Sequence, residues 1–310
     1  MISLLLLVVF TAAARAQTND TLNTQQSLAL TISPKVWDLL ETKANFITEA
    51  VRSIKFPEKE EKVAKLVKYK VWGGQIEQFT VPKSGVAFVD VNNGVHIRMT
   101  GIQFRGKVSA RLTIGRKIGR VRVSGDIQIS STSAELDMLL KWNDFNFIPT
   151  VSMNSELRVD FTHHLRRFNM IRKHVQNLAT KAANKKISDA IINDVNPRLQ
   201  KLKKMVEQRV KDYDVVWTVQ NQILRVEIRP RSSTGQVSPV KAIDKMLCVD
   251  LNLNHLLSSR SKRSVLAKGV DVTCVDPVAK CEGQSCSFCT NVDINPGPSG
   301  DMFHNCIPAF

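Results

Sequence analysis

The sequence predicts an α+β fold: a single elongated domain of long helices wrapped by a highly twisted antiparallel sheet, followed by a small disulfide-rich tail. Three observations lead to this prediction. Runs of alternating apolar and polar residues fill the first half of the chain, helical patterns flank these runs, and all six cysteines lie at or after Cys248. Alternation is typical of strands, and apolar residues at three- and four-residue steps are typical of helices.

The first helical pattern covers residues 31–54. Ser33 is suited to the N-cap and Pro34 to the first helical position. The apolar stripe of this helix consists of Val36, Leu39, Leu40, Ala44, Ile47, Val51 and Ile54. We expect the stripe to pack on the apolar face of the sheet.

The predicted strands come next and are joined by short turns, which indicates an antiparallel meander. The alternation is clearest where Val108, Ala110, Leu112 and Ile114 share one face. The expected strands cover residues 76–81, 86–91, 95–104, 108–114, 121–129, 136–140 and 157–161, with two later ones at 215–219 and 223–228.

A second helical pattern covers residues 163–211, which would make a helix about 70 Å long. We expect Pro197 to kink or break it, because proline clashes with the preceding turn. This helix is strongly basic, and such one-sided charge favours a surface that faces anions. The candidate contacts to an anionic surface are Arg166, Arg167, Arg172, Lys173, Lys201, Lys203 and Lys204.

The start of the chain has the pattern of a secretory signal peptide, with an apolar run before Ala14-Arg15-Ala16. The predicted organisation is a signal peptide at 1–16, a linker at 17–26, the elongated domain at 27–240 and a cysteine-rich region at 241–310. We therefore expect a secreted, extracellular protein, with a glycosylation site at Asn19. The net charge of +16 favours anionic partners, and secretion argues against nucleic acid.

Several segments, in this order and spacing, resemble one known family. They are 28–33, Ile54-Lys-Phe-Pro57, 69–82, 94–104, 125–129, 136–140, 187–199 and Tyr213-Asp-Val-Val-Trp217. Over residues 27–230 the chain resembles the N-terminal domain of the family of bactericidal/permeability-increasing protein, lipopolysaccharide-binding protein and cholesteryl ester transfer protein. Two departures are that 153–156 and the region of Ser188 lack the family's usual cysteines, and that no second similar domain follows.

The resemblance implies a tubular lipid-binding fold whose helices and sheet enclose acyl chains. Its implied ligand is phospholipid, lipopolysaccharide or a similar amphiphile, bound without catalysis or cofactor, for lipid transport or innate defence. The candidate residues for the wall of the lipid site are Val36, Leu39, Leu40, Ile47, Val51, Leu178, Ala182 and Leu202.

The C-terminal region is predicted to be held together by disulfides, because a region of this size buries little core. Its cysteines are Cys248, Cys274, Cys281, Cys286, Cys289 and Cys306, which allow fifteen pairings. A zinc site is the less favoured alternative, since an oxidising compartment favours disulfides. A basic sequence at Arg260–Arg263 resembles a proteolytic processing site.

Two other functions stay open at this point. The basic surface would also suit a binding module for anionic glycans with a solid core. The cysteine-rich region alternatively suggests a protease inhibitor or a receptor ligand. We expect no enzyme and no metal site, because the sequence lacks the common nucleophile, metal-ligand and phosphate-loop motifs.

Overall fold

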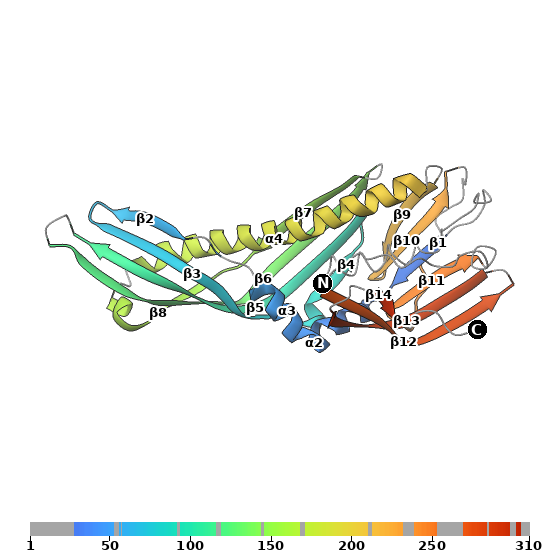
Figure 1. The fold of residues 1–310 in the computed structure, drawn as a ribbon, viewed down its shortest axis with the longest axis horizontal. Helices are drawn as coiled ribbons and strands as arrows, with labels where there is room; N and C mark the ends of the chain where they lie inside the picture. Colours follow the sequence, from blue (N-terminus) through green and yellow to red (C-terminus); the bar gives the residue numbers. More distant parts are fainter. Residues whose placement is uncertain are drawn as a thin grey trace.

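The computed structural model describes residues 28–52, 56, 58–91, 94–115, 119–143, 146–167, 171–209, 213–231, 239–252, 269–283, 285–297 and 302–304. The protein is elongated, with a curled antiparallel sheet at one end, a second sheet at the other, and one long helix running between them (Figure 1). The expected α+β class is therefore confirmed. The predicted signal peptide, the linker, Asn19 and Arg260–Arg263 lie outside the described residues.

The first sheet contains the predicted meander and has the order β2-β3-β5-β6-β7, with β4 paired to β5 and β8 to β6. Its strands are β2 (Lys59–Ala64), β3 (Val67–Thr80), β4 (Val86–Val89), β5 (Gly94–Ile114), β6 (Val121–Asn143), β7 (Asn146–Asn154) and β8 (Arg158–Phe161). Two pairs of predicted segments, 95–104 with 108–114 and 121–129 with 136–140, each prove to be one continuous strand. Strands β2 and β7 were not predicted.

Bulges in neighbouring strands bend the first sheet near its middle. In β5 the buried apolar side chains occupy odd positions before Gly101 (Val95, Ile97, Met99) and even positions after it (Ile102, Phe104, Ala110, Leu112). Gly101 has a φ of 69°, which suits the extra residue of a bulge. Strand β6 shifts register opposite this point, and β3 shifts near Gly73, whose φ is 63°. A bulge bends its strand and increases the local twist, so these irregularities curl the sheet.

The N-terminal helical region is shorter and more broken than predicted. Ser33 does cap it, because its hydroxyl accepts a hydrogen bond from the backbone N–H of Lys35 at 3.2 Å. Three pieces then follow: the 3-10 turn η1 (Pro34–Trp37), α2 (Asp38–Thr42) and α3 (Ala44–Arg52). Residues 31 and 32, predicted as helix, belong instead to strand β1 (Leu28–Ile32), because hydrogen bonds on both sides hold that strand extended.

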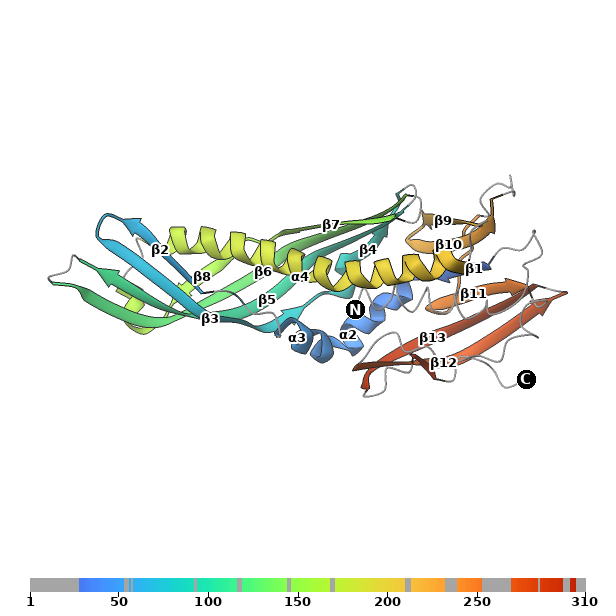
Figure 2. The same ribbon diagram turned by 45° about the horizontal axis from the view of Figure 1, so that its top comes forward.

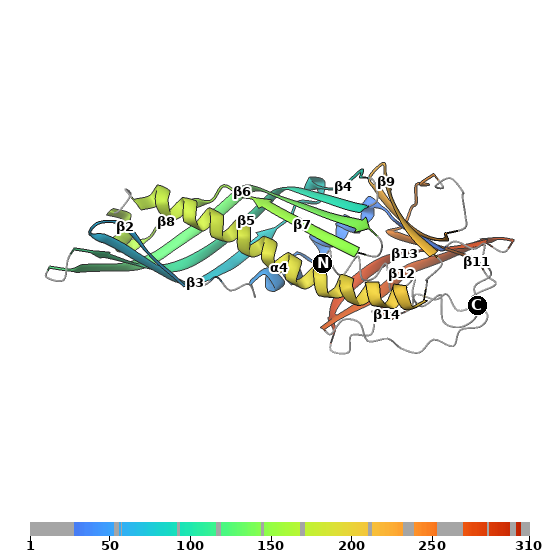
Figure 3. The ribbon, with the colours of Figure 1, turned by 90° about the horizontal axis from the view of Figure 1, so that it is seen from above.

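The long helix α4 (Arg172–Arg209) crosses the first sheet and continues toward the second (Figure 2, Figure 3). Its 38 residues correspond to about 57 Å. The predicted helix started at residue 163, where the structure has the 3-10 turn η3 (His163–Arg167) ahead of α4. The break predicted at Pro197 does not occur. Proline removes one hydrogen bond there, and the turns on either side keep theirs.

The second sheet combines the first described strand with later ones and has the order β14-β12-β13-β11-β1-β10-β9. Its later strands are β9 (Tyr213–Gln220), β10 (Ile223–Pro230), β11 (Leu247–Asn252), β12 (Gly269–Glu282), β13 (Ser285–Gly297) and β14 (Met302–His304). The sequence placed a boundary near residue 240 and a separate tail beyond it. In the structure β1 pairs with β10 on one side and with β11 on the other, so the cysteine-rich region shares one sheet with the rest.

Disulfides connect directly opposite residues of this second sheet. Cys248 of β11 is bonded to Cys289 of β13, and Cys281 to Cys286 across the β12–β13 hairpin. Cys274 is disulfide-bonded too, whereas Cys306 lies outside the described residues. Among the described helices, none has the combination of length and apolar composition needed to cross a lipid bilayer.

Candidate functional site

The apolar core consists of two clusters that meet at the bend of the first sheet. The larger cluster includes Trp37, Ile102, Leu136 and Trp217 and extends into both sheets. The smaller one contains Tyr69, Leu112, Ile127, Phe161 and Val175 and lies between the first sheet and the start of α4. Ile129 packs against both clusters, which places their junction beside the register shift of β6 that begins at Ser131.

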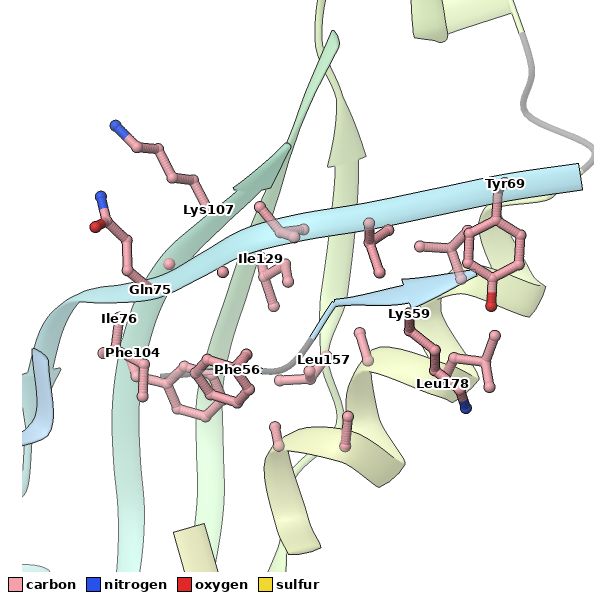
Figure 4. Close-up of a pocket in the computed structure, with 18 residues that line it drawn as sticks. Phe56, Lys59, Tyr69, Gln75, Ile76, Phe104, Lys107, Ile129, Leu157 and Leu178 are labelled. Atoms are coloured by element: carbon pink, nitrogen blue, oxygen red, sulfur yellow. The ribbon is translucent and has the colours of Figure 1, made fainter. Parts of the chain in front are cut away.

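A cavity of about 130 Å³ lies at this junction, between α4 and strands β3, β5 and β6 (Figure 4). The lining is mostly apolar or glycine: Phe56, Tyr69, Val71, Gly74, Ile76, Phe104, Gly106, Val108, Ile129, Leu157, Val175, Leu178, Ala179, Ala182 and Ala183, together with Lys59, Gln75 and Lys107. Small residues keep the space open. A Cβ on Gly106 would come within 2.7 Å of the Gln75 carbonyl oxygen, so this close approach of two strands requires glycine.

The polar side chains are not spread evenly around the cavity. Figure 4 shows Gln75 and Lys107 directed away from the apolar group, while the Tyr69 hydroxyl and the Lys59 ammonium lie near Leu178. The Tyr69 hydroxyl donates to Glu61 Oε2 at 3.0 Å, and Lys59 Nζ lies 2.5 Å from Glu61 Oε1. His174 Nε2 of α4 lies 3.8 Å from the same carboxylate. Lys59 and Tyr69 line one end of the cavity, and Glu61 and His174 contact them there. These four residues are here called the polar mouth.

Protonation at the polar mouth follows from these contacts. Burial, followed by the hydrogen bond to Glu61, raises the pKa of Tyr69, so the phenol stays a neutral donor. The hydrogen bond from Lys59 is the largest cause that lowers the pKa of Glu61, and the Tyr69 hydroxyl adds to it. At neutral pH the mouth thus presents a carboxylate held by an ammonium and a phenol.

Of the predicted wall residues, the structure brings Leu178 and Ala182 to the cavity. Val36, Leu39 and Leu40 are at most 4% exposed and lie within the larger cluster, away from this cavity. Val51 packs against that cluster. The side chains of Ile47 and Leu202 lie outside the described part of the structure.

Sequence reasoning missed the side of the cavity that the sheet forms, above all Tyr69, Phe104 and Gly106. It also missed Phe56, which lies outside the strands. One signal was available. Apolar residues occupy odd positions up to Met99 and even positions from Ile102 onward, with Gly101 between them. Such a change of phase at a glycine indicates a bulge, and therefore a bend in the sheet.

The predicted cationic residues fall into two separate groups. Arg166, Arg167 and Lys173 are exposed near the start of α4, and Lys204 is exposed about 47 Å further along the helix. Arg172 is half-buried, with its guanidinium 6.0 Å from the centre of the Phe161 ring. The side chains of Lys201 and Lys203 lie outside the described residues.

Comparison with known proteins identifies similar structures but no family. No family model and no curated protein matches the chain. The crystal structure of lipopolysaccharide binding protein matches 74% of this chain and 58% of its own, with 10% identity and a TM-score of 0.46. This chain thus spans little more than half of that protein's length. Epiphyas postvittana Takeout 1 matches 55% of this chain and 89% of its own, with 8% identity and a TM-score of 0.22. At these scores the two structures say nothing about what this chain binds.

Proposed function

We propose that this protein is a secreted, non-catalytic carrier that binds the apolar part of a lipid-like amphiphile. The observation that carries this proposal is the cavity at the junction of the two core clusters. Its inward-facing side chains are apolar, Gln75 and Lys107 point away from them, and the Lys59 ammonium and Tyr69 hydroxyl lie at one end. An amphiphile has the same division between an apolar chain and a polar head, and burial of the chain supplies roughly 25 cal/mol per Å².

The ligand proposed at this level is a phospholipid, lipopolysaccharide or similar amphiphile, in the service of lipid transport or innate defence. The cavity argues against a glycan-binding module with a solid core. Purified full-length protein should release lipid on solvent extraction and should take up a fluorescent lipid analogue. Native mass spectrometry of the protein before and after extraction provides the direct measurement.

A variant that fills the cavity tests whether the lipid binds there. Ala179→Phe places a ring in the cavity and should abolish uptake, while Asn177→Phe, on the exposed side of the same helix, should not. Thermal unfolding of both variants checks that they fold. Equal uptake by the two variants would place the lipid elsewhere, and absence of any lipid from all three proteins would refute the proposed function.

Docking on anionic membranes is the second part of the proposal and rests on the exposed cations of η3 and α4. Each can contribute about 1 kcal/mol near an anionic surface, and salt screens this contribution over ~8 Å. Arg166→Gln with Arg167→Gln and Lys173→Gln should weaken sedimentation with phosphatidylserine vesicles at physiological salt. A control with Lys241→Gln and Lys280→Gln, both exposed near or in the second sheet, should bind like the native protein.

A further inference from the structure

We infer that the cavity takes a single-chain amphiphile with a carboxylate head, bound with its tail toward Phe56 and Phe104 and its head at the polar mouth. This inference rests on the proposed function and narrows it. It concerns the number of chains, the direction in which the chain enters, and the chemistry of the head.

The number of chains follows from the size of the cavity. Its volume of about 130 Å³ is close to the roughly 150 Å³ that holds one benzene molecule in an engineered protein cavity. About six carbon atoms therefore fit. One short chain, or the end of one longer chain, matches this space, whereas two acyl chains side by side do not. A close-packed core does not expand without loss of contacts, so the space favours a single chain.

The direction follows from the two ends of the cavity. Phe56, Ile76 and Phe104 gather at the end away from Leu178 (Figure 4). Phe56 also fits tightly against the sheet, since a Cβ on Gly74 would lie 3.1 Å from the Phe56 Cβ. At the other end Lys59 is exposed. A chain that enters beside Lys59 displaces no aromatic ring, and this direction leaves its head beside Lys59 and Tyr69.

The head chemistry follows from the donors at the mouth. Lys59 offers an ammonium and Tyr69 a neutral hydroxyl, and both are now held by Glu61. Both groups donate hydrogen bonds to the same carboxylate, so a second carboxylate is the head that reproduces the acceptor they already have. The ligand's carboxylate competes with Glu61 for these donors. Removing the charge of Glu61 should therefore strengthen binding, which distinguishes this site from a general attraction of lipids to apolar surface.

Titration calorimetry on delipidated full-length protein tests the inference with butanoate, hexanoate, octanoate and decanoate, with octanol, and with dioctanoyl phosphatidylcholine. Affinity should rise about fourfold per methylene until the chain reaches the aromatic end, and then level off. Lys59→Gln should weaken octanoate about fivefold and leave octanol unchanged. Glu61→Gln should strengthen octanoate. Lys62→Gln, an exposed residue of β2 that does not line the cavity, is the matched control.

The outcomes distinguish the single-chain inference, the carboxylate assignment and the carrier function from one another. Thermal unfolding confirms that the variants fold. Tighter binding of dioctanoyl phosphatidylcholine than of octanoate, abolished by Ala179→Phe, overturns the single-chain inference and leaves the carrier function standing. Equal weakening of octanoate and octanol by Lys59→Gln overturns the carboxylate assignment. If none of the probes binds, the inference and the proposed function fall together.

Discussion

The two sheets of this protein are stabilised in different ways. The first sheet contains no cysteine, and its long strands bury apolar faces against α4 and against each other, as at Leu112 and Met138, each 1% exposed. The second sheet contains every described disulfide-bonded residue, and β12 leaves Val275 and Val278 about 40% exposed. Cross-links supplement packing where a strand has little to pack against.

The contrast has a limit, because the two sheets share one core. Leu247 of β11 and Val292 and Ile294 of β13 belong to the larger cluster together with Trp37 and Ile102. Two sheets that are built differently should therefore still unfold together. Removal of a cross-link, a packed side chain or an ion pair tests whether they do.

Removal of the Cys248–Cys289 disulfide should have the largest effect. It joins residues 41 positions apart, whereas Cys281 and Cys286 are 5 apart. Because longer loops lose more chain entropy on closure, replacing both partners by Ala should cost about 4 kcal/mol for the first pair and about 2 kcal/mol for the second. Denaturant unfolding measures both. One shared transition is expected in each variant. A separate early transition of the C-terminal region would instead support the separate tail that the sequence predicted.

Truncation of a packed side chain in the first sheet should have the next largest effect on stability. Leu112→Ala in β5 should lower the free energy of unfolding by about 3 kcal/mol, through lost burial and the cavity left behind. Leu66→Ala, at a position 44% exposed, is the control and should change it by less than about 0.5 kcal/mol. Similar losses from the two variants would mean that the smaller cluster does not stabilise this sheet.

The smallest effect concerns an ion pair between the helical region and the second sheet. Lys43 Nζ lies 2.7 Å from Asp293 Oδ1, and this contact is the largest cause that lowers the pKa of Asp293. Because the pKa of Asp293 is lower in the folded state, its carboxylate stabilises the protein at pH values above its unfolded-state pKa, near 4. This stabilisation is lost as the pH falls through the folded-state pKa. The Asp293 side chain is 41% exposed, so solvent screening keeps the contribution below about 1 kcal/mol.

Lys43→Gln tests this contact. Denaturant unfolding at several pH values should show a small loss of stability at pH 7, and the difference from the native protein should shrink as the pH falls below about 4. A difference that stays constant across this range would assign the loss to packing of the Lys43 side chain rather than to the charge of Asp293.

The sequence predicted those parts of the fold that depend on local pattern. The alternation from Val108 to Ile114 describes the buried face of β5 correctly, and the Ser33 cap lies where it was expected. The failures come from pairings between distant segments. No local pattern shows that β1 lies between β10 and β11. The sequence also divided β5 between residues 104 and 108, where the structure has one continuous strand.

The cavity was predictable only on its helical side. Leu178 and Ala182 lie on one stripe of α4, and helical periodicity identifies such a stripe. Tyr69, Phe104 and Gly106 come from two strands, and the alignment of β3 with β5 brings them together. Two register shifts interrupt that alignment, so strand patterns alone could not place these residues opposite one another.

The position of β1 has a consequence for the order of folding during synthesis. This strand is made first among the described elements, yet its partner residues in β10 lie about 200 positions further along the chain, and those in β11 come later still. Most strands of the first sheet pair with near neighbours in sequence and can form as they leave the ribosome, whereas contacts this distant form slowly. Until β11 emerges, β1 has an unpaired, apolar edge. A nascent chain halted before β11 should therefore depend on chaperones that bind exposed strands.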